Sequence, residues 1–141
     1  MGESTISFFS DEVDFELDNK SHYIKWVEKT ILAESKTLGE ISFVFCSDEY
    51  LHKINLEYLK HDTYTDIITF DYSEEKGVSG DIFISIDRVR ENGLEFKKEF
   101  YNELSRVIIH GVLHLVGYKD KTNQEKAQMR EKEDFYLNLL S

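Results

Sequence analysis

Two histidines and an aspartate occur at a spacing typical of metal ligands. His110 and His114 are four residues apart in an apolar segment with helical character, so both rings are expected on one face of a helix. Gly117 is the residue type that ends helices with a positive φ, and Asp120 follows it closely on the returning chain. Two imidazoles and a carboxylate, with a fourth position left open, are the ligands of a catalytic zinc site. We therefore predict that His110, His114 and Asp120 bind one metal ion, with Zn²⁺ as the expected ion.

The aspartate and the glycine between the histidines refine this chemistry. A carboxylate is a harder ligand than a third imidazole, so Ni²⁺, Mn²⁺, Fe²⁺ or Co²⁺ could also bind. In zinc peptidases a glutamate follows the first histidine and acts as the general base. The corresponding position here is Gly111. The sequence thus keeps the ligand spacing and lacks the peptidase's base.

The residue patterns predict an α/β (α+β) fold that would position these ligands. Strands are expected at residues 6–10, 41–47, 66–72 and 81–86, and helices at 22–38, from 47 or 48 to about 59, at 96–116 and at 122–140. Gly39 is expected to end the first helix, and residues 77–80 to form the turn between the last two strands. This order predicts a mixed sheet of about four strands packed with helices.

The predicted helix at residues 96–116 should be the central, buried one. Its C-terminal half is apolar nearly all round, apart from a narrow polar stripe of Glu103, Arg106, His110 and His114. The alternative interpretation is that both histidines are core or capping residues. We favour metal binding, because unpaired polar groups in an apolar segment are costly.

Composition indicates a single domain over residues 1–141. Cys46 is the only cysteine, so an internal disulfide is excluded. The sequence has no apolar run of membrane-spanning length and no signal-peptide pattern, so we expect a cytoplasmic protein. The net charge of −11 counts against broad electrostatic capture of nucleic acid, although a local basic cleft stays possible.

The histidine segment resembles the signature of the YbeY family of bacterial metal-dependent endoribonucleases. Residues 110–118 read His-Gly-Val-Leu-His-Leu-Val-Gly-Tyr, and the blocks at 55–58, 62–70 and 80–82 are similar to further family blocks in the same order. The resemblance covers residues 49–120. It implies a single-strand-specific endoribonuclease of rRNA maturation, acting at the 3′ end of 16S rRNA and in ribosome quality control. Its implied partners are RNA, the ribosomal small subunit and ribosome-associated proteins, with no membrane.

Three positions depart from the family pattern. Asp120 stands where the family usually has a third histidine, and remains a competent ligand. The family's arginine, implied to contact RNA or stabilise phosphate, falls on Leu59, with Lys60 beside it. Lys60 can supply a point charge but not the bidentate fork of an arginine. Tyr64 replaces a proline, which should affect only the local turn.

The resemblance also implies that other side chains around the metal assist the reaction. A cation should offset negative charge on the reacting phosphorus, and the candidates for this catalytic role are Lys60 and Arg106, with Lys119 as a third. Arg106 could instead pair with Glu103. Asp62 and Asp66 could orient a ligand histidine, or could be turn and strand-edge residues.

Two other functions remain as alternatives to an endoribonuclease. A metallopeptidase would explain the ligand spacing, but Gly111 leaves it without a base. A non-catalytic, ribosome-associated binding factor would hold the metal structurally. An open coordination position argues against it, because structural zinc is normally closed by four protein ligands.

Overall fold

A mixed sheet forms the centre of the protein. The computed structural model describes residues 5–73 and 77–140. Within this part of the chain, four strands lie in the order β1 (Ile6–Asp11), β2 (Leu38–Cys46), β4 (Val78–Ser85) and β3 (Ile67–Asp71). β1, β2 and β4 are parallel, and β3 is antiparallel to β4. The predicted fold class, a mixed sheet packed with helices, is confirmed.

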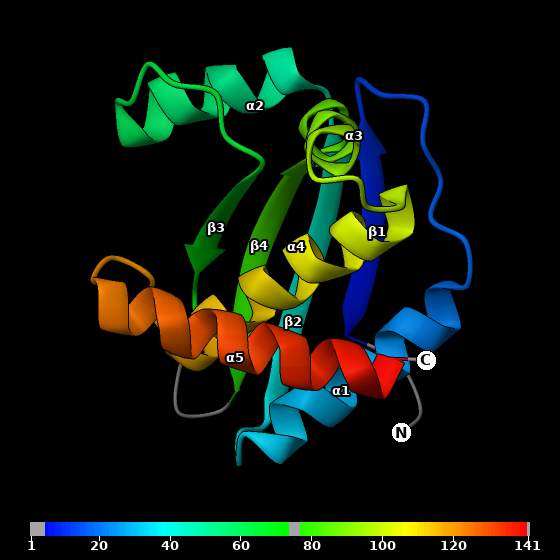
Figure 1. Ribbon diagram of the computed structural model, residues 1–141, viewed down its shortest axis with the longest axis vertical. Coiled ribbons are helices and arrows are strands. Elements are labelled where there is room, and N and C mark those ends of the chain that lie inside the picture. Colours follow the sequence, from blue (N-terminus) through cyan, green and yellow to red (C-terminus); the bar gives the residue numbers. More distant parts are fainter. Residues whose placement is uncertain (1–4, 74–76, 141) are drawn as a thin grey trace.

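Helices cover both faces of the sheet. They are α1 (Lys20–Ala33), α2 (Asp48–Ile54), which continues as the π-helix η1 (Asn55–Leu59), α3 (Ile86–Glu95), α4 (Phe100–Val116) and α5 (Asn123–Leu140). Figure 1 shows α4 in yellow crossing one face of the sheet and α5 in orange to red lying across α4. Among the described residues, no helix is both long and apolar enough to span a membrane.

The main core lies between the sheet and α4. In the parallel register of β2 and β4, Phe43 is beside Ile82 and Phe45 beside Ile84, and none of the four is more than 1% exposed. Alternate residues of a strand share a face, so these side chains form one apolar layer. Ile108 of α4 is fully buried in the same cluster. With α5 packed on its outer side, α4 is the central buried helix that the sequence predicts.

A smaller apolar cluster covers the opposite face. Leu51 and Ile54 of α2 pack there on Cys46 and Ile68. The Oγ of Ser47 accepts a hydrogen bond from the N–H of Tyr50 at 3.1 Å, so the predicted cap of this helix is confirmed. The last residues of the predicted helix form η1 instead of continuing the α-helix.

The predicted helix at 96–116 begins too early, and a helix before it is missing from the prediction. The chain passes from β4 into α3 without a loop, because the Oγ of Ser85 accepts a hydrogen bond from the N–H of Arg88 at 3.1 Å. Ile86, expected as the end of a strand, is the first residue of α3. The break before α4 contains Lys97 at φ 57°. A lysine in this left-handed conformation gives no glycine signal.

Two predicted boundaries at glycines are also wrong. The first helix ends at Ala33 instead of Leu38, and Ser35 follows with φ 62°. Gly39, the expected stop, lies inside β2. Gly80, expected in a turn, lies inside β4, which begins at Val78. Residues 74–76 of that connection lie outside the described part of the chain.

Candidate metal centre

The end of α4 brings the three predicted ligands together. Gly117 follows the last helical residue with φ 126°, a conformation that favours glycine. The N–H groups of Gly117 and Tyr118 both donate to the carbonyl of Leu113, at 3.1 Å and 3.0 Å. These bonds turn the chain back toward the helix, as the position of Gly117 predicts. Asp120 consequently reaches the two histidine rings.

The donor atoms of the cluster converge on one point. The Nε2 atoms of His110 and His114 are 3.1 Å apart. Oδ2 of Asp120 is 3.2 Å from Nε2 of His110 and 3.3 Å from Nε2 of His114. A tetrahedral Zn²⁺ with donors at about 2.0–2.1 Å requires donor separations of roughly 3.3 Å. The donor set and its spacing therefore fit a metal ion. Among the described residues, this is the group of His, Cys, Asp and Glu side chains that could hold one.

The cluster is open to solvent on one side. The side chains of His110, His114 and Asp120 are 21%, 28% and 37% exposed. His110 and Asp120 line a cavity of about 440 Å³ between the start of β3, α4 and α5. Three protein donors that are partly exposed, two of them at the wall of a cavity, leave room for a substrate or water, as in catalytic zinc sites.

Gly111 is explained by the packing of α4 on the sheet. A Cβ atom at this position would lie 3.0 Å from Cδ1 of Ile67 and 3.0 Å from Cγ2 of Ile82. Position 111 therefore faces the sheet and not the cavity. A glutamate there could not reach the metal cluster without displacing β3 or β4, which is a physical reason against the peptidase alternative.

A carboxylate that was not predicted from the sequence contacts the ring of His110. Oε2 of Glu133 lies 2.6 Å from Nδ1 of His110, and the Glu133 side chain is 7% exposed. Glu133 belongs to α5, which starts in a capping box. The Oγ1 of Thr122 accepts from the N–H of Glu125 at 3.0 Å, and the Glu125 carboxylate accepts from the N–H of Thr122 at 3.0 Å. This cap fixes where α5 begins, soon after Asp120.

Only one of the two aspartates considered for this position lies near His110. Oδ1 of Asp62 lies 2.8 Å from Nε2 of His52, and the Asp62 side chain is largely exposed. Asp66 lines the cavity with His110, and its backbone carbonyl accepts a hydrogen bond from the N–H of Ser85 at 2.9 Å. The only signal for Glu133 in the sequence is its place on a polar stripe of a charged helix, which many surface helices share.

Burial and charge shift the titration of these groups. Burial lowers the pKa of His110, but the hydrogen bond and charge of Glu133 and the charges of Asp120 and Asp66 outweigh it, and the net shift is upward. Burial raises the pKa of Glu133, but His110 and Arg106 more than compensate, and its pKa is lowered. Burial raises the pKa of Asp66. The carboxylates create a field that favours a cation at the cluster.

The three basic residues predicted to assist catalysis differ in their position relative to the cavity. Arg106 lines the cavity, but its guanidinium binds Glu133 at 2.7 Å and Asp134 at 2.6 Å instead of Glu103. Lys60 is exposed at the end of η1, with φ 57°, and is not among the lining residues of the cavity. Lys119 is also exposed.

Two further basic residues of α5 face the cavity. Lys126 and Arg130 line it one helical turn apart, and within the described chain neither forms an ion pair. Their i, i+4 spacing could have suggested a shared face, but nothing in the sequence shows that this face turns toward the metal ligands.

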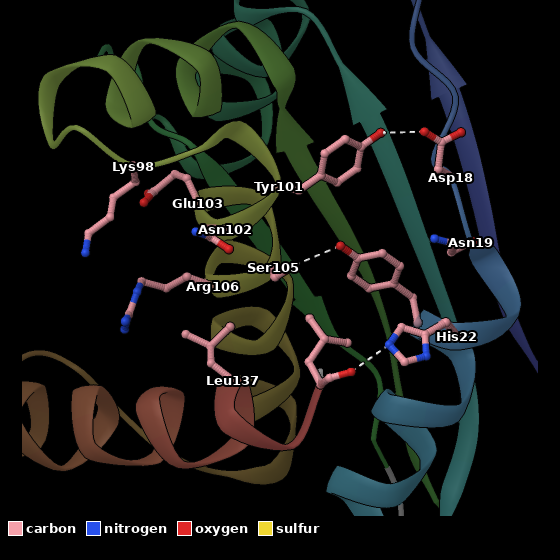
Figure 2. A pocket seen from close by; sticks show the side chains of 12 residues that line it. Asp18, Asn19, His22, Lys98, Tyr101, Asn102, Glu103, Ser105, Arg106 and Leu137 are labelled. Carbon is pink, nitrogen blue, oxygen red and sulfur yellow. Dashed lines mark hydrogen bonds between the residues drawn. The ribbon is translucent and has the colours of Figure 1, made fainter.

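A second cavity of about 670 Å³ adjoins the first. Glu103 and Arg106 line both cavities. Figure 2 shows this cavity between the start of α1, α4 and the end of α5. Tyr23 also lines it, and its hydroxyl lies 2.8 Å from Oγ of Ser105. Tyr101 and Asn102 contribute polar and aromatic surface. The two cavities therefore lie next to each other along α4.

Comparisons with known proteins agree with this site. Residues 6–141 match the family described as Endoribonuclease YbeY. A protein of that name from Christiangramia forsetii is 55% identical over 134 residues, which cover 95% of this chain and 93% of the relative. One from Flavobacterium psychrophilum is 54% identical, covering 93% and 94%. A solution structure of a protein from Thermotoga maritima aligns with TM-score 0.67 and 26% identity, over 96% of this chain and 88% of that one. The chain belongs to the Endoribonuclease YbeY family, as the resemblance of its histidine segment predicts.

Proposed function

We propose that the protein is a metal-dependent endoribonuclease that cleaves single-stranded RNA during rRNA maturation in the cytoplasm. One observation supports this most strongly. Three donor atoms from the end of α4 and the following loop converge within 3.3 Å of one another, and two of the three residues, His110 and Asp120, line a cavity. The names of the relatives supply the reaction, hydrolysis inside an RNA chain.

We propose that His110, His114 and Asp120 hold one Zn²⁺ ion, with other divalent transition metals as possible replacements. A divalent ion bound there supplies Lewis-acid chemistry to phosphodiester hydrolysis. The protein's own contribution is to fix the three donors, to keep one side of the cluster open and to provide positive charge nearby.

For that positive charge we favour Lys126 and Arg130 over Lys60 and Arg106. Lys126 and Arg130 line the cavity, whereas two carboxylates already neutralise Arg106. A cation close to the reacting phosphate stabilises the charge that develops on its oxygens. Arg130 can also form two parallel hydrogen bonds to a phosphate.

The shape of the surface favours a flexible strand as the substrate. Two adjoining cavities lie along α4, and we propose that successive nucleotides of one strand occupy them. The overall charge of −11 disfavours capture of RNA from a distance. We therefore propose that ribosome-associated proteins or the small subunit bring the 3′ end of 16S rRNA to the site.

The decisive experiment compares two histidine variants. Purified protein loaded with Zn²⁺ is incubated with a labelled single-stranded RNA, beside His114→Ala and the control His61→Ala. His61 is exposed, and its backbone N–H donates a hydrogen bond to the carbonyl of Asn55, which the substitution leaves in place. We expect cleavage by the wild type and His61→Ala, and a loss of at least about a hundredfold in His114→Ala.

Equal cleavage by all three samples would mean that a contaminating nuclease is responsible, and the proposal would fail. No cleavage by metal-loaded wild type on free RNA or on assembled small subunits would favour the non-catalytic binding factor. In that case His114→Ala should still associate with ribosomes.

A further inference from the structure

Glu133 occupies the position from which one metal ligand can be oriented. Its two carboxylate oxygens have different partners, with Oε2 2.6 Å from Nδ1 of His110 and Oε1 2.7 Å from Nη1 of Arg106. The side chain is 7% exposed and comes from α5, outside the histidine motif. We infer that Glu133 is a positioning residue that fixes the tautomer and ring orientation of His110 for metal binding.

The tautomer follows from the donors and acceptors at this contact. An ionised carboxylate only accepts hydrogen bonds, so Nδ1 of His110 must carry the hydrogen. In the neutral ring, Nε2 then has the free lone pair. Nε2 is the atom that lies 3.1 Å from Nε2 of His114 and 3.2 Å from Oδ2 of Asp120. The lone pair is thus directed to the point where a metal would bind.

Arg106 holds this carboxylate in place. Its Nη1 donates a hydrogen bond to Oε1 of Glu133 at 2.7 Å, and its Nη2 donates to Oδ1 of Asp134 at 2.6 Å. A guanidinium has only donors, so it engages one oxygen of Glu133 and leaves the other oxygen directed at Nδ1 of His110. Arg106 therefore acts on the site through Glu133 and not directly on a phosphate.

The inference makes α5 part of the metal site. Metal-binding histidines commonly donate their second N–H to a carboxylate, and loss of that carboxylate typically weakens metal affinity about 10- to 100-fold. The inference rests on the metal binding proposed above but not on RNA cleavage. Its test therefore measures metal affinity and ring protonation.

The experiment compares Glu133→Gln with Asp134→Asn. Both substitutions remove one negative charge from neighbouring residues that bind Arg106, but only Glu133 contacts His110. Zn²⁺ affinity of the metal-free proteins is measured by competition with a chromophoric chelator, after circular dichroism and thermal unfolding have compared the folds. We expect about 10- to 100-fold weaker binding by Glu133→Gln and a change within about threefold for Asp134→Asn.

A second readout reports the tautomer directly. Long-range ¹H–¹⁵N spectra of the metal-free wild type, recorded at a pH where the His110 ring is neutral, should show the hydrogen on Nδ1. Glu133→Gln should show a mixture or a reversal, because its amide can donate to Nδ1. An Nε2–H tautomer in the wild type would overturn the inference even if Glu133→Gln failed to fold. Zinc binding by Glu133→Gln as tight as that of Asp134→Asn would also overturn it.

Discussion

The hydroxyl of Tyr118 donates a hydrogen bond to Oε1 of Glu34 at 2.7 Å, and this bond ties the loop after α4 to the end of α1. Tyr118 lies two residues before Asp120, so the contact restrains the segment that presents the third ligand. The other oxygen of Glu34 accepts hydrogen bonds from Tyr136 and Lys132 of α5. One carboxylate, 10% exposed, therefore links α1, α5 and the ligand loop.

Removal of the Tyr118 hydroxyl should weaken metal binding without changing any ligand. Tyr118→Phe keeps the ring and loses the hydrogen bond to Glu34, so the loop that carries Asp120 gains freedom. We expect the free energy of unfolding to fall by about 1 kcal/mol and the zinc affinity to fall several-fold. Chemical denaturation and chelator competition measure the two effects. Tyr58→Phe, at an exposed tyrosine, is the control. Equal zinc affinity in the two variants would show that the bond does not restrain Asp120.

Acid stability should depend on Glu34. Burial raises the pKa of its carboxyl, but the hydrogen bonds from Tyr136 and Tyr118 and the charge of Lys132 outweigh burial, and the pKa falls below its usual 4.5. A carboxyl with a lowered folded-state pKa stabilises the fold above its unfolded pKa, and this stability is lost as the pH falls through the folded pKa.

The wild type should therefore lose stability as the pH falls from about 5 to 3, and Glu34→Gln should show a shallower loss over this window. Urea denaturation at a series of pH values measures the slope. Glu131→Gln, at an exposed position on α5, is the matched control. If Glu34→Gln and the wild type gave parallel curves, the ionised Glu34 would not be a source of stability.

The metal ligands could be predicted from sequence because all three lie within one local segment. The i, i+4 spacing of His110 and His114 and the positive φ of Gly117 depend on the geometry of a single helix end. The sheet was predictable for a similar reason, since alternating apolar residues in β2 and β4 mark their buried face. These features need no knowledge of distant parts of the chain.

The support around the ligands depends on how distant elements pack. Glu133 is 23 residues from His110, and Glu34 is 84 residues from Tyr118. No spacing rule connects such pairs, because α5 has charged residues on several sides and only its docking on α4 selects Glu133. The break at Lys97 was missed for another reason, since the left-handed residue there is not glycine.

Replacing either of two glycines near the site with alanine should destabilise the protein, for a different reason in each case. At Gly117 a Cβ atom would meet nothing within 4 Å, but φ is 126°, so Gly117→Ala strains the backbone alone. We expect the free energy of unfolding to fall by about 1–3 kcal/mol. Zinc binding should also weaken, because the loop that leads to Asp120 changes its path. Gly111→Ala instead brings a Cβ within 3.0 Å of Ile67 and Ile82.

In Gly111→Ala, the crowded Cβ atom should lower the free energy of unfolding by about 1–3 kcal/mol. The higher helix propensity of alanine should offset about 1 kcal/mol of this loss. Zinc affinity of folded Gly111→Ala should stay near the wild-type value. Denaturation curves and zinc titrations of both variants separate the two effects. A Gly117→Ala protein with unchanged stability would contradict the strain argument, and a Gly111→Ala protein with lost zinc binding would contradict the assignment of position 111 to the sheet side.

Asp120 should set the metal preference of the site. Asp120→His replaces the carboxylate with a third neutral imidazole, which is the softer ligand. We expect the preference for Zn²⁺ over Mn²⁺ to rise on the order of tenfold, while Asp120→Ala should weaken the binding of both ions. Competition titrations with the two metals measure the ratio. An unchanged ratio in Asp120→His would show that the residue does not coordinate the ion.

Removal of the metal should destabilise the folded protein through the same three residues. An ion that binds only the folded state stabilises it by about 2.7 kcal/mol when its free concentration is 100 times its Kd. Thermal unfolding should therefore shift upward when Zn²⁺ is added to protein treated with a chelator. His110→Ala, His114→Ala and Asp120→Ala should each lose this shift, whereas His61→Ala, outside the donor cluster, should keep it. A zinc-dependent shift that persisted in all three ligand variants would place the ion elsewhere on the chain, because none of the converging donors would then be required for its binding.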